Sequence, residues 1–200
     1  MAIERLAYET LESDGPFQVR RIRPHVVAET LVEGGFETVG NVGFRRLVAY
    51  ISGENRTRES FAMTTPVGQA RPSQKLAMTA PVGQARIGDR YRITFLMPQA
   101  LSLDELPEPL DARVRLVEEP ARTVAAIRYR GFWTRSRYDE HEQRLRDWMG
   151  KRGLAAAGAP EWARYHPPFM PWFLRRNEIW IECSTTSARS PYRSRDQPVV

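Results

Sequence analysis

FAMTTPVGQA at residues 61–70 and LAMTAPVGQA at residues 76–85 are nearly identical segments near the middle of the chain. Each runs from apolar residues to a proline, Pro66 or Pro81. Proline lacks the backbone N–H that a sheet interior requires. We therefore expect two short strands that end at these prolines, with a turn at residues 71–73 between them.

The sequence before these segments predicts a strand and then a helix. Residues 17–32 are extended in character, and Pro24 within them indicates a bulge or an edge position. Gly34-Gly35 ends this run, and Ser52-Gly53 closes the helix that follows. The helix carries its apolar residues at helical spacing: Phe36, Val39, Gly43, Phe44, Leu47 and Ile51.

The sequence after the segments predicts a second helix among further strands. Strands are expected at residues 91–97, 112–117, 123–129 and 177–183. The helix spans residues 135–152, with Gly153 at its C-cap. The stretches 101–110 and 155–174 are rich in proline and are expected to be irregular. One face of the helix is apolar: Tyr138, His141, Leu145, Trp148 and Met149.

The order of these elements repeats roughly once along the chain. Strand, helix and strands are followed by strands, helix and strand. This order predicts an α+β fold in which two amphipathic helices pack on one shared antiparallel sheet. Each half would leave a cleft between helix and sheet, where a ligand would fit.

Composition narrows the class of protein. The net charge is +6, supplied mostly by scattered arginines without a nucleic-acid-binding motif, so we expect a basic surface that attracts anionic small molecules rather than nucleic acid. A single cysteine, Cys183, excludes an internal disulfide framework. No apolar run approaches the ~20 residues of a membrane span, so we expect a cytoplasmic protein, with a monomer favoured.

Several motifs fall in the order of a known family. FRRLVAYISG at residues 44–53 resembles the end of that family's first helix, and AMTTPV and AMTAPV resemble its paired strands. YHPPFMPWFLRRNEIW at residues 165–180 resembles its closing signature. From about residue 8 to residue 183, the chain resembles the SOUL haem-binding family.

The resemblance implies a fold and an activity. The fold is a distorted, barrel-like antiparallel sheet with two helices in pseudo-twofold repeat, similar to the effector-binding domains of multidrug-sensing regulators. The activity is non-catalytic binding of haem or another tetrapyrrole in an apolar cleft, as a buffer or carrier. The domain spans residues 1–183, and the small, polar, basic residues 184–200 are expected to be a disordered tail.

A tetrapyrrole is a flat apolar plate with two propionates, so its site needs apolar walls and a cation at the rim. Large apolar residues in an irregular loop are unusual unless they cover something. Arg175 directly after that loop would pair with a propionate, and Gly43 would let a flat ligand approach the helix. The candidate cofactor-binding residues are Val39, Gly43, Leu47, Met63, Met78, Phe169, Met170, Trp172, Phe173 and Arg175.

No residue stands out as a metal ligand. His25, His141 and His166 are the only histidines, and none has a context that favours an axial bond, so we expect haem without a strong axial ligand. Two alternatives remain. One is an effector-binding module for other hydrophobic small molecules; the other is a small hydrolase or lyase that uses Glu178 in the same cleft.

Overall fold

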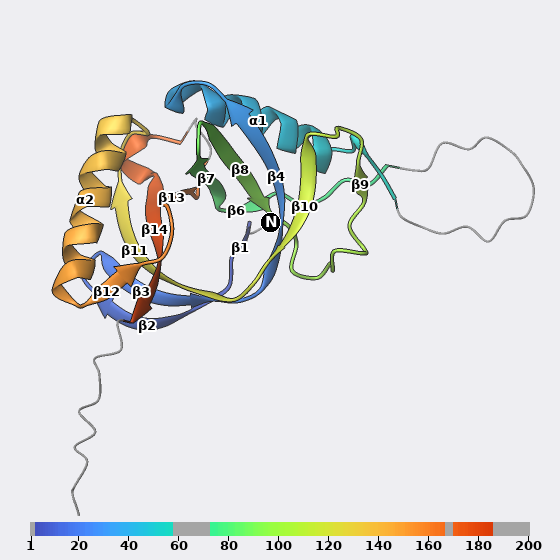
Figure 1. The fold of residues 1–200 in the computed structure, drawn as a ribbon. Coiled ribbons are helices and arrows are strands. Elements are labelled where there is room, and N and C mark those ends of the chain that lie inside the picture. Colours follow the sequence, from blue (N-terminus) through green and yellow to red (C-terminus); the bar gives the residue numbers. More distant parts are fainter. Residues whose placement is uncertain (1–2, 58–72, 167–169, 186–200) are drawn as a thin grey trace, which may run out of the picture.

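The computed structural model describes residues 3–57, 73–166 and 170–185, which form a curled antiparallel sheet with two helices on its outer side (Figure 1). The strands are β1 (Glu4–Arg5), β2 (Tyr8–Asp14), β3 (Phe17–Ile22), β4 (His25–Glu33), β5 (Asn55–Arg56), β6 (Thr79–Ala80), β7 (Val82–Ile87), β8 (Arg90–Leu96), β9 (Glu108–Pro109), β10 (Val114–Glu119), β11 (Arg122–Arg130), β12 (Leu154–Ala156), β13 (Glu161–Arg164) and β14 (Arg176–Thr185). The helices are α1 (Phe36–Ile51), α2 (Arg135–Lys151) and the short 3-10 turn η1 (Trp172–Leu174).

The main sheet has the order β10-β4-β8-β7-β13-β14-β11-β3-β2, and β12 pairs with β14 outside this path. Two halves are visible in this order. The unit β4-α1-β7-β8 is matched by β11-α2-β13-β14, and the two units meet at the antiparallel pair of β7 and β13. The predicted two-helix repeat on a shared antiparallel sheet is therefore confirmed.

The halves exchange their first strands. β3 precedes β4 in the chain but pairs with β11, and β10 precedes β11 but pairs with β4. Each half thus completes the sheet of the other. The two repeats therefore share one continuous sheet.

Both helices end where the sequence predicts. Gly53 follows α1 with φ +122°, and Gly153 follows α2 with φ +66°, a backbone conformation that side chains with a Cβ disfavour. The apolar stripes of both helices face the sheet, since Leu47 of α1 and Leu145 of α2 are fully buried. These stripes position α1 and α2 over the outer face.

The sheet has apolar residues on both faces, in the alternation expected of strands. In β11, Ala125 and Ile127 belong to the main core under the helices, whereas Val124 and Ala126 face the inner side of the curl. The inner cluster also contains Leu6 from the N-terminal segment. The main core therefore lies between the helices and the sheet.

Three predicted elements differ in the structure. Residues 17–32 form two strands, because the chain turns at Pro24 and β3 and β4 pair with strands on opposite sides of the sheet. The strand predicted before Pro81 is only two residues long: β6 ends at Ala80 and pairs with β1, and directly after Pro81 the chain continues as β7, which pairs with β8 and β13. The stretch 155–174 was expected to be irregular, yet it contains the central strand β13.

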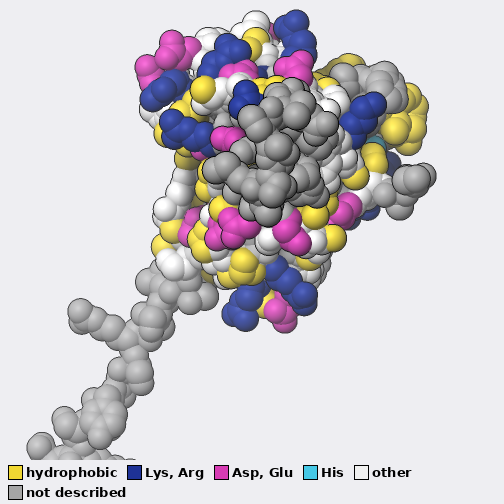
Figure 2. Space-filling model, turned by 90° about the vertical axis from the view of Figure 1, so that its right-hand side faces the viewer, with side chains coloured by type: hydrophobic (Ala, Val, Ile, Leu, Met, Phe, Trp, Pro, Cys, Tyr) yellow, Lys and Arg dark blue, Asp and Glu magenta, His cyan; other side chains and the backbone are white. Residues whose placement is uncertain are grey.

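Some predictions lie outside the described residues. These are the strand at residues 61–70 with Met63, the residue Phe169, and the tail from residue 186 onward. β14 extends to Thr185, two residues beyond the predicted end of the final strand. Among the described residues, no helix is long and apolar enough to cross a membrane. On the face shown in Figure 2, basic and acidic side chains are interspersed.

Candidate ligand-binding site

A narrow cleft lies between α1, β7 and β13. It encloses about 60 Å³, room for a few water molecules. The edge of a planar ring could enter this space, but a whole tetrapyrrole could not. The lining residues come from five parts of the chain: Gly40, Asn41, Phe44, Val82, Gly83, Gln84, Ile93, Trp133, Arg164 and His166.

Two glycines allow α1 to approach the sheet closely here. A Cβ on Gly43 would stand 2.4 Å from Cγ1 of Ile93, a distance that real Cβ atoms do not show. A Cβ on Gly40 would stand 3.0 Å from Nη1 of Arg164 and 3.1 Å from Oε1 of Gln84. The close approach of α1 thus depends on small residues along one side of the helix.

Two guanidinium groups lie against Trp133 beside the cleft. The Cζ atoms of Arg164 and Arg175 are 4.9 Å and 4.7 Å from the centroid of its ring, within cation–π distance. Trp133 is held by its indole N–H, which donates to Oδ1 of Asn177 at 2.7 Å. Arg164 in turn donates to Oε1 of Gln84 at 2.7 Å. Positive charge is therefore concentrated at one edge of the cleft.

A group of large apolar side chains is exposed close to these arginines. Phe132, Trp172 and Phe173 are 51%, 49% and 53% exposed, and together with Leu174 we call them the aromatic surface. The rings of Phe132 and Trp172 stack with centroids 5.0 Å apart. Exposed apolar side chains clustered in this way indicate a site of contact with a ligand or partner.

The structure places the predicted site residues in three environments. Met170, Trp172, Phe173 and Arg175 lie together at the aromatic surface and its arginine edge. Val39 and Leu47 of α1 are buried in the main core, while Gly43 packs on Ile93 beside the cleft. Met78 is exposed and lines a separate hollow of about 300 Å³ near the end of α1.

Sequence reasoning missed Phe132, Trp133 and Arg164. Phe132 and Trp133 follow Gly131 in the connection between β11 and α2, where the prediction named no element. Arg164 belongs to the strand that was not predicted, in which Trp162 two residues earlier faces the main core. Arg164 alternates with Ala163 and so shares the helix-facing side with Trp162, but a strand of four residues is too short for the sequence to show this.

The hydrogen bonds of the histidines fix which ring nitrogen is available. Nδ1 of His166, in the cleft, accepts from the backbone N–H of Arg176 at 2.9 Å, so Nε2 of the neutral ring carries the proton. Nδ1 of His141 donates to the carbonyl of Arg137, and the ring is stacked on Tyr129 in the interior. Neither histidine offers a lone pair to the cleft.

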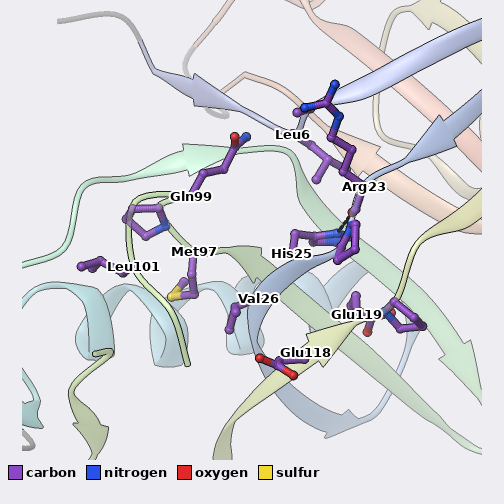
Figure 3. Close-up of a pocket in the computed structure, with 13 residues that line it drawn as sticks. Leu6, Arg23, His25, Val26, Met97, Gln99, Leu101, Glu118 and Glu119 are labelled. Carbon is purple, nitrogen blue, oxygen red and sulfur yellow. Dashed lines mark hydrogen bonds between the residues drawn. The ribbon is translucent and has the colours of Figure 1, made fainter. Parts of the chain in front are cut away.

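His25 is different. Its Nδ1 donates to the carbonyl oxygen of Arg23 at 2.8 Å, which leaves Nε2 as an acceptor. It lines another cavity, together with Val26 and Met97 (Figure 3). Among the described residues, no group of three or more His, Cys, Asp and Glu side chains could hold a metal ion.

Glu178 lies on the inner face of the sheet within a cluster of donors. Its carboxylate, 0% exposed, accepts from Nη1 of Arg20 at 2.6 Å and from Nη2 of Arg176 at 2.8 Å. Tyr165 and Trp180 donate to the same group, at 3.1 Å and 2.8 Å. Burial alone would raise the pKa of Glu178, but these arginines and hydrogen bonds outweigh it and hold the pKa at about 2.

The surroundings of Glu178 bear on the two alternative functions. A general acid or base works best with a pKa near the operating pH, whereas Glu178 remains ionised throughout the neutral range. Its charge is already matched by Arg20 and Arg176, and Arg128 lies within 3.2 Å. The cluster therefore favours neither proton transfer nor capture of a cationic ligand.

Solved structures similar to this one show the class of fold. The C-terminal domain of EcmrR is 12% identical, with a TM-score of 0.56 over 89% of this chain and 98% of that one. A hydrolase from Listeria innocua is 13% identical, with a TM-score of 0.52 over 92% and 94%. At such identities the likeness concerns the fold alone, and it supports the predicted barrel-like antiparallel sheet with two helices.

The sequence itself defines the family. A model of the SOUL heme-binding protein family matches residues 3–182. The chain therefore belongs to the SOUL heme-binding protein family. A search of curated protein sequences finds no match to the chain.

Proposed function

We propose that this protein binds haem or another tetrapyrrole at the mouth of the cleft beside α1, as a buffer or carrier and without turnover. The observation that carries the proposal is the pair of guanidinium groups held against Trp133 next to the aromatic surface. Membership of the SOUL family supports haem as the ligand class.

The residues at this site fit a tetrapyrrole in shape and charge. The narrow cleft would admit one edge of the plate, and the aromatic surface would cover its face. Arg164 and Arg175 would pair with the propionates, a contact that guanidinium groups make well. Burial of several hundred Å² at ~25 cal/mol per Å² contributes several kcal/mol, reduced by ordering costs, so we expect micromolar affinity.

Binding is expected to depend little on the iron. Haem supplies an iron centre when bound. The cleft histidine, His166, has no lone pair for that iron, because Nδ1 accepts from the backbone N–H of Arg176 and Nε2 carries the proton. The attraction must then come from apolar burial and from the arginine edge. Haemin and metal-free protoporphyrin should bind within about tenfold, or ~1.4 kcal/mol, of each other.

A fluorescence-quenching titration with both ligands tests this proposal. We expect Trp172→Ala and Phe173→Ala to weaken both ligands by about tenfold, because each removes apolar contact area. Arg175→Ala should weaken both by a few-fold and flatten the fall in affinity with rising salt. Arg130→Ala, an exposed arginine of β11, is the matched control and should change little.

Two outcomes would contradict the proposal. One is affinity that none of the aromatic-surface variants changes, which would place the ligand elsewhere. The other is haemin binding far tighter than protoporphyrin, with a low-spin spectrum that a single histidine substitution abolishes. The histidine identified in that case would mark the true site.

A further inference from the structure

A more spacious cavity, which shares no lining residue with the narrow cleft, is the one that His25 lines. It encloses about 510 Å³, within the roughly 300–1,000 Å³ range of small-molecule pockets. Its walls are built by the N-terminal segment, the start of β4, the end of β10 and the loop after β8 (Figure 3). Leu6, Val26, Met97 and Leu101 make these walls largely apolar.

Three prolines restrict the backbone around this cavity. Pro24, Pro98 and Pro120, from three different connections, all line it. A proline ring fixes φ and removes a backbone donor, so these connections have little freedom to lose when a ligand enters. A cavity that is already formed binds with a smaller ordering cost than one that must be assembled.

One side chain gives the cavity a directional polar contact. The imidazole of His25 lines it, as the close-up shows, with its Nδ1 bonded to the carbonyl of Arg23. A carbonyl only accepts, so Nδ1 must donate and the neutral ring presents Nε2 as an acceptor. Among the described histidines, His25 alone combines a free acceptor nitrogen with a cavity of this size.

The nearby carboxylates do not compete for that acceptor position. Glu119, paired across the sheet with His25, is bound to Arg92, which also contacts Glu29. Glu118 is exposed at the rim. Nε2 of His25 is therefore left to accept from a ligand N–H or O–H in the cavity.

We propose that this cavity is a second ligand site, for a flat, largely apolar ring compound that donates an N–H or O–H hydrogen bond to Nε2 of His25. It is separate from the tetrapyrrole site in residues and in chemistry. The tetrapyrrole site relies on the arginines at its edge, whereas this cavity, although Arg23 also lines it, relies on the acceptor nitrogen of His25.

Indole and 1-methylindole are suitable probes, because they differ only in whether the ring nitrogen can donate. We expect indole to bind about five- to tenfold more tightly, as one hydrogen bond of typical net strength provides. Titration of isotope-labelled full-length protein, followed by NMR, should shift the signals of Val26, Met97 and Leu101. Those signals identify the cavity.

Two variants separate the hydrogen bond from the shape of the cavity. His25→Phe keeps a planar ring and removes the acceptor, and His25→Ala removes both. In each variant the two probes should bind with equal affinity. Haemin binding should be unchanged in both, which also shows that the variants are folded and that the test is independent of the proposed function.

Three results would overturn the proposal: equal affinity for the two probes in the unmodified protein, a preference for indole that survives in His25→Phe, or shifts confined to Trp133 and the aromatic surface. Loss of haemin binding in the titrations above would leave this proposal intact. Failure of either proposal is thus distinguishable from failure of the other.

Discussion

The carboxylate of Glu178 connects ionisation to folding. It is enclosed on the inner face of the sheet and shared by Arg20, Arg176 and Arg128. Arg20 is itself buried, with 1% of its side chain exposed. Removing the negative charge would leave a buried guanidinium without its counter-ion, a change that typically costs several kcal/mol.

We expect Glu178→Gln to lower the free energy of unfolding by roughly 3–5 kcal/mol. Arg128→Ala removes a partner whose side chain is 48% exposed, so its cost should stay below about 1 kcal/mol. Urea unfolding at neutral pH measures both. Equal, small losses in the two variants would show that the buried cluster contributes little.

The same carboxylate predicts a dependence of stability on pH. Folding lowers its pKa from 4.5 to about 2, so its contribution is fully present above pH 4.5 and is lost as the pH falls toward 2. A shift of this size corresponds to roughly 3 kcal/mol. Other acids titrate in this range, so the measurement is the difference between the unmodified protein and Glu178→Gln, which should shrink on acidification.

At the scale of elements, α1 depends on its glycines for contact rather than for flexibility. Gly43 packs directly on Ile93, and a Cβ added to Gly43 would overlap the side chain of Ile93. Gly150, in the last turn of α2, has nothing within 4 Å of its Cβ position. The two glycines therefore provide a matched pair of substitutions.

Gly43→Ala should destabilise the protein by about 1–3 kcal/mol through overpacking, although alanine favours helix formation. Gly150→Ala should be neutral or stabilising by up to ~1 kcal/mol, since only the propensity changes. Thermal unfolding measures both. A stabilised Gly43→Ala would mean that α1 moves away from β8 without loss.

Element type was predictable wherever a periodic pattern was long. The stripes of α1 and α2 and the glycines after them gave both helices nearly to the residue. The strand β13 was not predicted, because its four residues, EWAR, are too few to show alternation and are flanked by proline-rich sequence. Arg164 was missed for the same reason; it lies on the ring of Trp133 together with Arg175, which the sequence analysis had named.

Pairing between distant elements could not be predicted in this way. Nothing in the local sequence of β3 indicates that it pairs with the distant strand β11 rather than with β4, the next strand in the chain. The separation of the helix stripe into core residues, such as Leu47, and cleft residues, such as Phe44, depends on the same three-dimensional arrangement. Such contacts arise from the packing of the whole chain.

At the scale of the whole molecule, exchange of β3 and β10 couples the two halves. This coupling can be observed because all five tryptophans lie between residues 133 and 180, in the second half. Tryptophan fluorescence thus reports unfolding of that half, while circular dichroism reports the whole chain. Independent halves would give two separate transitions.

We expect the two probes to give coincident unfolding curves. Leu47→Ala, a fully buried change in α1, should destabilise the protein by about 2–5 kcal/mol and shift both curves equally. Val42→Ala, on the exposed side of the same helix, is the control and should shift neither by more than about 0.5 kcal/mol. Fluorescence that does not respond to Leu47→Ala would show that the halves unfold separately.

The exchange of strands also has a consequence during synthesis. β4 and β8 can pair early, but β3 must wait for β11, and β7 for β13. About 100 residues separate β3 from β11, and about 75 separate β7 from β13. At roughly 5–20 residues per second, a nascent chain on the ribosome exposes these unpaired edges for about 4–20 seconds, so crowded translation at high temperature should favour its aggregation before its release.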